Sequence, residues 1–368
     1  MGERPLRLVF AGGGTGGHLY PALAIADEIR RRHPDAVIVF VGTAGKIESR
    51  VVPTRGYPFV RIWISGFRRA LTPETLLFPL KVIVALLQSA LLLWRKKPDV
   101  VIGTGGYVCG PVVAAAQILG RRTLIQEQNS IPGATTRLLA PRADEVHIAF
   151  EGTGRHLRRR DNVRTTGNPT RDIIGAVSRT EGARFFGLDG AKKTLLVFGG
   201  SRGAAGINAA MAPLAGELAG EGIQIIWQTG EEEFGSLSRV TGVLREGVKL
   251  YPFIEKMEYA YAACDLAICR SGATSLAELT RAGVPSILIP YPYAAADHQT
   301  ENAKAMVEAG AGVLIPDASA SALLPAALRG LINDRERLQK MREAARHLGK
   351  PGAAGVLADA VERLAGAL

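Results

Sequence analysis

The hydrophobic positions of this chain fall into short apolar runs that alternate with longer segments of helical periodicity. The runs are continuous, which suits strands buried on both faces of a parallel sheet. In the first half they lie near residues 6–10, 37–41, 58–63, 99–103, 122–126 and 145–149. In the second half they lie near residues 194–198, 224–228, 248–251, 265–268, 285–289 and 312–315. This alternation predicts an α/β fold with doubly wound parallel sheets, whose ligands bind at the carboxyl ends of the strands.

The first strand of each half runs directly into a glycine-rich loop. Residues 6–10 lead into GGGTGGH at 12–18, and residues 194–198 lead into GGSRG at 199–203. Such loops let a ligand approach the backbone, and the helix that follows offers unpaired N–H groups to an anion. We therefore expect two Rossmann-like domains facing one cleft, as in an enzyme that joins a phosphorylated donor to a second substrate.

Length and turn signals place the boundary between these domains. At 368 residues the chain exceeds what one hydrophobic core usually serves. Residues 155–164 are polar and basic, and residues 166–169 have the composition of a turn. The sequence predicts an N-terminal domain at 1–165 and a C-terminal domain at 166–351.

Charge and cysteine content narrow the function classes. Residues 1–160 hold 23 lysines and arginines against 11 aspartates and glutamates, which predicts an acidic partner for the first half. Nucleic acid is not expected, because aromatic residues make up only 6% and no recognition motif is present. Three scattered cysteines favour a reducing compartment, and the N-terminus has no signal-peptide pattern.

The longest apolar stretch, residues 76–94, has two interpretations. Its length nearly suffices to span a bilayer, but Pro79 and Lys81 interrupt it early. Lys81, Gln88 and Arg95 recur every seven residues, and Ser89 and Lys96 adjoin this polar stripe. The stretch is either a buried crossover helix or a helix half-sunk in an anionic membrane surface. The basic residues 68–69 and 95–97 favour the second interpretation.

The glycine loops do not indicate a nicotinamide enzyme. Gly12, Gly14 and Gly17 match the dinucleotide pattern, but that pattern needs an acidic residue at the end of the second strand. No carboxylate follows that strand until Glu48. A further glycine cluster at 103–110 follows another strand, so three strand ends are suited to close ligand approach.

Three features suggest group-transfer chemistry. His18 stands at a helix start, where the helix dipole disfavours its cationic form and leaves an imidazole able to accept a proton. Glu127 is the alternative base. Thr274 and Ser275 are predicted to cap a helix whose N-terminus suits a diphosphate, and Glu278 is placed for ribose hydroxyls. No Asp-x-Asp occurs, so no obligatory metal and no cofactor are predicted.

Seven blocks together resemble a known family. They are GGGTGGH (12–18), GGYVCGP (105–111), EQN (127–129), NPTR (168–171), GGSRG (199–203), GATSLAE (272–278) and DHQTEN (297–302). The chain resembles the peripheral-membrane N-acetylglucosaminyltransferases of bacterial peptidoglycan synthesis over nearly its whole length. The resemblance implies the glycosyltransferase-B architecture, with residues 352–368 packing back on the first domain. It also implies inverting transfer of GlcNAc from UDP-GlcNAc to the muramyl 4-hydroxyl of lipid I, at the cytoplasmic face of the plasma membrane.

The resemblance assigns residues to each substrate, with His18 and Glu127 as the catalytic candidates. The implied UDP-GlcNAc contacts are Thr15, Gly16, Gly17, Asn129, Arg171, Ser201, Ile254, Ala273, Thr274, Ser275, Leu276, Ala277, Glu278 and Gln299. The implied acceptor contacts are Gly14, Gly105, Gly106 and Tyr107. The implied membrane contacts are Leu76, Leu77, Phe78, Leu80, Ile83, Leu87 and Trp94. Anionic phospholipid is an expected partner, and other proteins of cell-wall synthesis are candidate partners.

Three residues depart from the motifs of this family, and the sequence also allows two alternative functions. Cys109 replaces a usual serine, Arg202 a usual glutamine, and Gln126 a usual histidine before the Glu-Gln-Asn block. Gln126 weakens any mechanism that needs a histidine there. The alternative enzyme is a UDP-sugar epimerase of the same architecture, which needs no lipid acceptor. The other alternative is a non-catalytic membrane or nucleotide-sensing protein, which would have the glycine loops without a usable base, and His18 argues against it.

Overall fold

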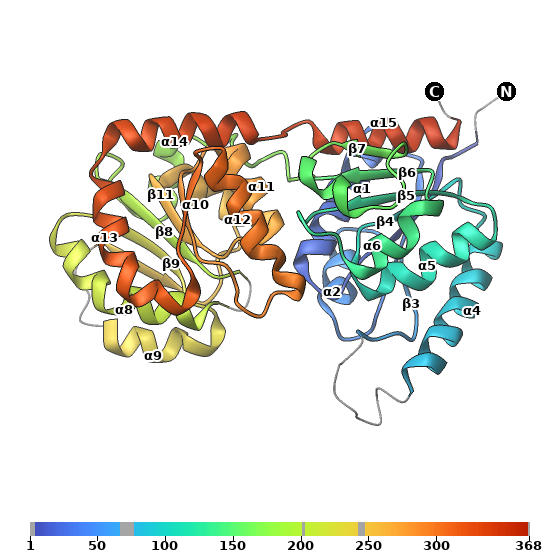
Figure 1. The fold of residues 1–368 in the computed structure, drawn as a ribbon, viewed down its shortest axis with the longest axis horizontal. Coiled ribbons are helices and arrows are strands. Elements are labelled where there is room, and N and C mark those ends of the chain that lie inside the picture. The colour runs from blue at the N-terminus through green and yellow to red at the C-terminus, as the bar shows by residue number, and fades with distance from the viewer. Residues whose placement is uncertain (1–3, 67–76, 201–202, 242–246, 367–368) are drawn as a thin grey trace. The chain divides into compact units, whose positions relative to one another are not determined.

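The strands of the computed structural model form two separate parallel sheets (Figure 1). The structure describes residues 4–66, 77–200, 203–241 and 247–366. The chain divides into unit 1, residues 1–170 and 351–368, and unit 2, residues 171–350. The division falls at residues 170 and 350. The turn signals predicted the first boundary at 165, and the resemblance implied the second at 351.

Unit 1 is built on a seven-stranded parallel sheet in the order β3-β2-β1-β4-β5-β6-β7. Its strands are β1 Arg7–Ala11, β2 Val37–Gly42, β3 Phe59–Arg61, β4 Val100–Gly103, β5 Arg122–Glu127, β6 Glu145–Ile148 and β7 Val163–Thr165. Its helices are α1 Gly16–Arg32, α2 Ile47–Thr54, α4 Phe78–Lys96, α5 Gly106–Ile118, α6 Ala134–Leu139 and α15 Ala353–Ala365, with short 3₁₀ turns η1 Ala140–Arg142 and η2 Glu151–His156. Strand order reverses between β1 and β4, so the loops after these two strands lie at the position where such sheets bind ligands.

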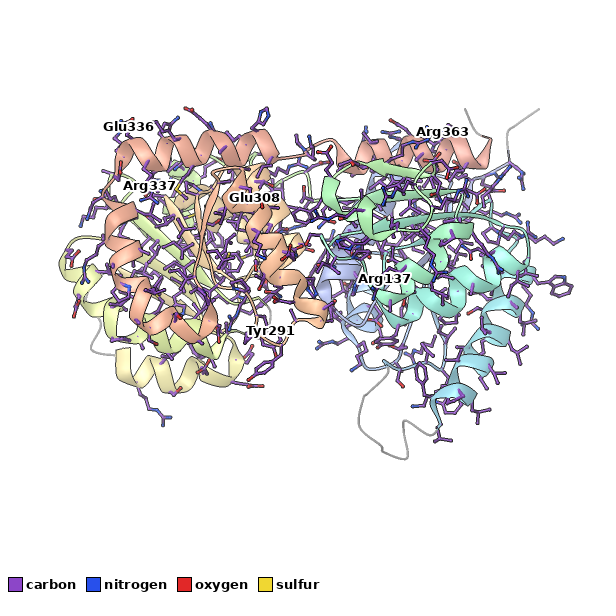
Figure 2. All side chains as sticks on the ribbon, in the orientation of Figure 1. Arg137, Tyr291, Glu308, Glu336, Arg337 and Arg363 are labelled. Carbon is purple, nitrogen blue, oxygen red and sulfur yellow. The ribbon has the colours of Figure 1, made fainter. Side chains whose placement is uncertain are left out.

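The last helix returns to unit 1 and packs beside α1. Leu357 and Val361 of α15 are fully buried in the same core as the inner face of α1. Arg32 at the end of α1 pairs with Asp359 and Glu362. Arg363, labelled in Figure 2, donates to Glu145 of β6 at 2.9 Å. The C-terminal segment is therefore joined to unit 1 by both apolar burial and ion pairs.

Unit 2 is built on a six-stranded parallel sheet in the order β10-β9-β8-β11-β12-β13. Its strands are β8 Thr194–Phe198, β9 Gln224–Gln228, β10 Val248–Tyr251, β11 Leu266–Cys269, β12 Ser286–Leu288 and β13 Gly312–Leu314. Its helices are α7 Arg179–Phe185, α8 Ala205–Gly220, α9 Glu231–Thr241, α10 Met257–Ala263, α11 Ala273–Ala282, α12 His298–Glu308, α13 Ala320–Ile332 and α14 Arg335–Leu348, with 3₁₀ turns η3 Ala295–Asp297 and η4 Asp317–Ser319. Its central strands are apolar and almost fully buried, as continuous hydrophobic runs require.

All twelve expected strands are present, and β7 is the one that the apolar pattern missed. β7 is three residues long at the edge of its sheet, and Arg164 and Thr165 are exposed. An edge strand of this kind has no continuous apolar run to reveal it.

Helix α4 is only partly buried, so the interpretation as a buried crossover helix is wrong. It is the one helix of the described chain that is long and apolar enough to cross a membrane, and 17% of its most apolar window is buried. Ala85, Ser89 and Leu93 form its buried stripe. Ser89 therefore does not belong to a solvated polar face, and its hydroxyl donates to the carbonyl of Ala85 at 2.6 Å.

The opposite face of α4 is apolar and open to solvent. Its large exposed side chains are Leu80, Ile83, Leu87, Leu91 and Trp94. Leu77 just before the helix is also exposed, whereas Phe78 is half-buried.

The expected polar stripe of α4 partly contacts the protein itself. The Gln88 side chain accepts from the Trp63 N–H at 2.8 Å, and the Lys81 ammonium donates to Ser65 at 3.2 Å. Arg95 and Lys96 extend the polar end of the helix into solvent.

Candidate functional site

In unit 1, the glycine loop between β1 and α1 lies against the loop after β4. A Cβ on Gly12 would lie 1.9 Å from the Thr104 hydroxyl oxygen, which itself donates to the His18 carbonyl at 2.8 Å. Gly14 has φ +86°, and a Cβ there would lie 2.8 Å from the Tyr107 ring. Both loops thus approach more closely than any side chain on the glycines would permit.

The His18 imidazole packs on the second pair of glycines. A Cβ on Gly105 would lie 2.6 Å from His18 Cδ2, and one on Gly106 would lie 3.4 Å from Nδ1. The Thr15 hydroxyl lies 3.0 Å from Nδ1. Either group can be the donor in this contact, according to the tautomer of the ring. The loop residues therefore fix the position of the imidazole ring.

A buried carboxylate lies beneath this loop. Glu48 of α2 is 1% exposed and accepts from the Gly14 N–H at 2.9 Å and the Thr43 hydroxyl at 2.9 Å. The Thr43 hydroxyl also lies 3.1 Å from the Tyr107 hydroxyl. Burial raises the pKa of Tyr107 and the nearby Glu48 charge adds to this rise, so the phenol stays neutral near pH 7.

Glu127, at the end of β5, is surrounded by donors from its own loop. Its carboxylate accepts from the backbone and side-chain N–H groups of Asn129 at 3.1 and 3.2 Å. It also accepts from the Gly133 N–H at 3.1 Å and the Thr136 hydroxyl at 2.6 Å. Both carboxylate oxygens thus shape the loop that carries Asn129.

The Gln126 side chain forms hydrogen bonds in the interior of unit 1. It is fully buried, and its amide N–H₂ donates to Asn168 Oδ1 at 3.3 Å. Its carbonyl oxygen accepts from the Gln128 amide. The departure from histidine at this position therefore places an amide in a buried network that joins the EQN and NPTR blocks.

In unit 2, the glycine loop after β8 is held by the end of β9. Gly203 has φ +77°, and a Cβ there would lie 2.1 Å from the Thr229 carbonyl oxygen. The Gln228 amide donates to the Gly200 carbonyl at 2.7 Å and accepts from the Ile254 N–H at 2.8 Å. One glutamine thus positions both the glycine loop and the Ile254 backbone.

Helix α11 begins next to this loop, after β11. Its N-cap is Gly272, which has no side chain to cap the helix, so the predicted cap by Thr274 and Ser275 is wrong. The first turn of the helix lies at the carboxyl edge of the sheet, after β11.

Charged side chains gather around α11. Arg171 lies 3.2 Å from Glu258 of α10 and 3.8 Å from Glu278 of α11. Glu278 also accepts from the Tyr261 hydroxyl at 3.0 Å. Burial raises the pKa of Glu278, while Arg171 and Tyr261 lower it and the Glu258 charge raises it. This cluster offers a guanidinium and a carboxylate to a polar ligand.

Gln299 is placed by a strained turn. Ala296 and Asp297, before α12, have φ +52° and +53°, which is uncommon for residues with a side chain. The side-chain amide oxygen of Gln299 accepts from the backbone N–H of Tyr291 at 3.0 Å, and the backbone carbonyl of Gln299 accepts from the Ser271 hydroxyl at 2.7 Å.

Each unit matches a known protein-family domain. The glycosyltransferase family 28 N-terminal domain matches residues 8–148, and the glycosyltransferase family 28 C-terminal domain matches residues 194–357. This chain belongs to glycosyltransferase family 28.

Relatives within the family match over almost the full chain. The Chlorobaculum tepidum UDP-N-acetylglucosamine–N-acetylmuramyl-(pentapeptide) pyrophosphoryl-undecaprenol N-acetylglucosamine transferase is 47% identical, over 97% of this chain and 98% of the relative. The crystal structure of Acinetobacter baumannii MurG has a TM-score of 0.77 at 28% identity, over 98% of this chain and 100% of that one. A Listeria monocytogenes protein assigned as a UDP-N-acetylglucosamine 2-epimerase has a TM-score of 0.68 at 13% identity, over 98% and 96% of the two chains, and shares the fold. The chain is thus a family 28 glycosyltransferase of two Rossmann-like domains.

The predicted site residues of this family 28 chain divide between its units. Those in unit 1 are Gly14, Thr15, Gly16, Gly17, His18, Gly105, Gly106, Tyr107, Glu127 and Asn129. Those in unit 2 are Arg171, Ser201, Ile254, Ala273, Thr274, Ser275, Leu276, Ala277, Glu278 and Gln299. Ser201 and Leu76 lie outside the described residues. Within the described ranges, no cluster of three or more histidine, cysteine, aspartate or glutamate side chains could hold a metal ion.

Sequence reasoning missed three residues that organise these loops. They are Glu48, Gln228 and Glu258. Glu48 was noted only because it stands too late for a dinucleotide fingerprint, and Glu258 has no motif of its own. The signal for Gln228 was its place at the end of a predicted strand, next to the second glycine loop.

Proposed function

We propose that this chain transfers GlcNAc from UDP-GlcNAc to the muramyl 4-hydroxyl of lipid I, undecaprenyl-pyrophosphoryl-MurNAc-pentapeptide, and thereby forms lipid II with inversion at the anomeric carbon. The observation that carries this proposal is the 47% identity, over almost the full chain, to a relative named for that transfer. The epimerase alternative is less supported, because the likeness to an assigned epimerase is 13% identical and shows the fold alone.

Donor binding is proposed mainly for unit 2. The N-terminus of α11, residues 273–277, would bind the diphosphate through its N–H groups, with Arg171 and Ser201 adding to phosphate binding. Glu278 would accept from ribose hydroxyls. The Ile254 N–H is already donated to Gln228, so its carbonyl is the atom proposed to accept from the uracil N–H. The GlcNAc moiety would contact Gln299, Asn129, Thr15, Gly16 and Gly17.

The general base is proposed to be His18. The imidazole, which Thr15 and the Gly105–Gly106 pair hold in place, would accept the proton of the attacking hydroxyl. The Glu127 carboxylate already accepts four hydrogen bonds from its loop, so this geometry favours His18 over Glu127. Loss of this proton raises the nucleophilicity of the acceptor oxygen as the bond to the diphosphate breaks.

Departure of UDP is proposed to be assisted electrostatically. Charge builds on the diphosphate as the glycosidic bond breaks, and the N–H groups of α11 with Arg171 would stabilise it. No obligatory metal is proposed, because the chain has no Asp-x-Asp. Gly14, Gly105, Gly106 and Tyr107 are proposed for the acceptor side.

Peripheral attachment to the cytoplasmic face of the plasma membrane is proposed for unit 1. The exposed apolar face of α4 would enter the interface, where each buried side chain contributes about 1.5–3 kcal/mol. Arg95, Lys96 and Lys97 at the helix end would contact anionic head groups. This arrangement brings unit 1 to the surface that contains a lipid-linked acceptor.

Product analysis tests the proposed reaction. The protein is incubated with labelled UDP-GlcNAc, with and without a lipid I analogue and with EDTA in parallel. The proposal predicts UDP and a β-linked disaccharide product only with the acceptor, and undiminished transfer in EDTA. An epimerised sugar without acceptor, and no disaccharide with it, would overturn the proposal.

A further inference from the structure

Glu48 is a buried carboxylate for which the chain makes room with two glycines. A Cβ on Gly13 would lie 2.6 Å from its carboxyl carbon, and one on Gly42 would lie 2.5 Å from its Cγ. Its helix, α2, is a surface element, yet the Glu48 side chain turns inward and is 1% exposed. The space beneath the first glycine loop is therefore fitted to this one side chain.

Three donors satisfy the Glu48 carboxylate. They are the Gly14 N–H at 2.9 Å, the Thr43 N–H at 3.2 Å and the Thr43 hydroxyl at 2.9 Å. No lysine, arginine or histidine pairs with Glu48 in the part of the chain that the structure describes. Its position in the first turn of α2 adds the favourable end of that helix dipole. A buried anion is thus held mainly by the backbone of the glycine loop and by Thr43.

The same contacts fix the direction of a proton chain. An ionised carboxylate only accepts, so the single Thr43 hydroxyl proton points to Glu48. The Tyr107 hydroxyl, 3.1 Å from Thr43 Oγ1, must then donate its own proton to Thr43. Tyr107 consequently presents oxygen lone pairs, and not a proton, to any ligand on its open side.

We propose that Glu48 is a positioning residue that acts as the built-in anion of the first glycine loop and makes Tyr107 a hydrogen-bond acceptor for the acceptor substrate. In a dinucleotide-binding loop the backbone N–H groups are available to a phosphate. Here the Gly14 N–H is already bound, so this donor is not available to a nucleotide phosphate. Tyr107 accepts from a hydroxyl or amide N–H of the acceptor instead of donating to its diphosphate. The inference rests on the proposed function for its substrates.

The test compares Glu48→Gln and Glu48→Ala with Glu151→Gln, an exposed glutamate of unit 1 that starts a 3₁₀ turn. Glutamine keeps the shape but loses the charge and one acceptor oxygen. We expect kcat with the lipid I analogue to fall about 10–100-fold in both Glu48 variants, because the loop and Tyr107 shift. The Kd of UDP-GlcNAc, measured by calorimetry, changes far less than kcat, since only the GlcNAc contacts of residues 15–17 lie on this loop and the donor diphosphate is assigned to unit 2.

Two further readouts separate positioning from a general loss of structure. Formate supplies the missing carboxylate and raises turnover of Glu48→Ala, but not of Glu48→Gln, whose amide fills the space. Hydrogen exchange of the peptide that contains Gly14 becomes faster in both variants and stays unchanged in Glu151→Gln. Wild-type kcat in Glu48→Gln with unchanged exchange at Gly14 would overturn the inference. If the wild-type protein itself transfers no GlcNAc, the proposed function fails, and exchange at Gly14 alone then decides whether Glu48 holds the loop.

Discussion

Substitution of Arg171 is predicted to lower both the stability of unit 2 and the binding of UDP-GlcNAc, and the two effects can be separated. Its guanidinium lies 3.2 Å from Glu258 and 3.8 Å from Glu278, and its side chain is 29% exposed. At an effective dielectric constant near 20, charges at these separations attract by about 5 and about 4 kcal/mol before desolvation is subtracted. Removing one partner of a buried pair typically costs 3–5 kcal/mol. With allowance for partial exposure, we expect Arg171→Gln to destabilise unit 2 by about 2–3 kcal/mol at pH 8.

The penalty should depend on pH in a defined direction. Burial already raises the pKa of Glu278 above its ordinary 4.5, and Arg171 opposes that rise. Without Arg171 the folded-state pKa moves further up, so the folded state binds more protons than the unfolded state above 4.5. The destabilisation is therefore full above the raised folded pKa and declines as the pH falls toward 4.5. We expect a clearly smaller penalty at pH 5.5 than at pH 8.

The fluorescence of Trp227 can report on the unfolding of unit 2 alone. Trp227 is fully buried in unit 2, whereas Trp63 and Trp94 are exposed in unit 1. In a background of Trp63→Phe and Trp94→Phe, urea unfolding followed by fluorescence therefore reports on unit 2. The urea unfolding of the Arg171→Gln variant is measured at pH 5.5 and pH 8, and its Kd for UDP-GlcNAc is measured in parallel.

A second substitution and a control complete this test. Glu258→Gln removes one of the two charges left unpaired, so it should recover part of the lost stability of Arg171→Gln without restoring UDP-GlcNAc binding. Arg329→Gln, which breaks the exposed pair with Glu217, should leave the urea midpoint unchanged. A pH-independent penalty, or further destabilisation on adding Glu258→Gln, would refute the reasoning.

Three further predictions concern the membrane, the thiols and acid stability. Leu87→Glu, on the exposed face of α4, should weaken sedimentation with anionic vesicles about tenfold or more and leave soluble donor binding intact; equal sedimentation would argue against docking by α4. Burial raises the pKa of Cys109 and Cys264 to about 12 and that of Cys269 further, so no thiol should react with a thiol reagent at pH 8 before unfolding, and rapid native labelling would contradict their burial. Burial lowers the pKa of His147 below 6.5 although Glu145 opposes this, so the free energy of unfolding should fall as the pH drops below about 6.5. The His147→Gln variant should lose less stability than the wild-type protein between pH 7 and pH 5. An unchanged dependence on pH would exclude His147 as its source.

Local patterns were sufficient to predict the sheets because their central strands are buried on both faces. Residues 194–198 and 224–228 coincide with the central strands β8 and β9. The edge strand β7 escaped because one face of it contacts water and its residues are mixed. The exposed apolar face of α4 could be suspected from composition, but burial depends on which side packs on α5.

The candidate site was predictable only where it lies on glycine loops. A glycine motif at a strand end identifies the loop, as it did for Gly14 and His18. Glu48 could not be recognised, because its role depends on space left by Gly13 and Gly42 at separate strand ends. The N-cap of α11 likewise depends on the register of the helix start, which places Gly272 there.

The central claim is that His18 is the base for transfer of GlcNAc to lipid I, and one measurement addresses it most directly. Initial rates of transfer from UDP-GlcNAc to a lipid I analogue are compared for the wild-type protein and His18→Gln, with the donor Kd of each. The account predicts metal-independent transfer by the wild-type protein and a loss of about 10²–10⁴-fold in kcat for His18→Gln, with donor binding nearly unchanged. Transfer at the wild-type rate by His18→Gln would contradict it.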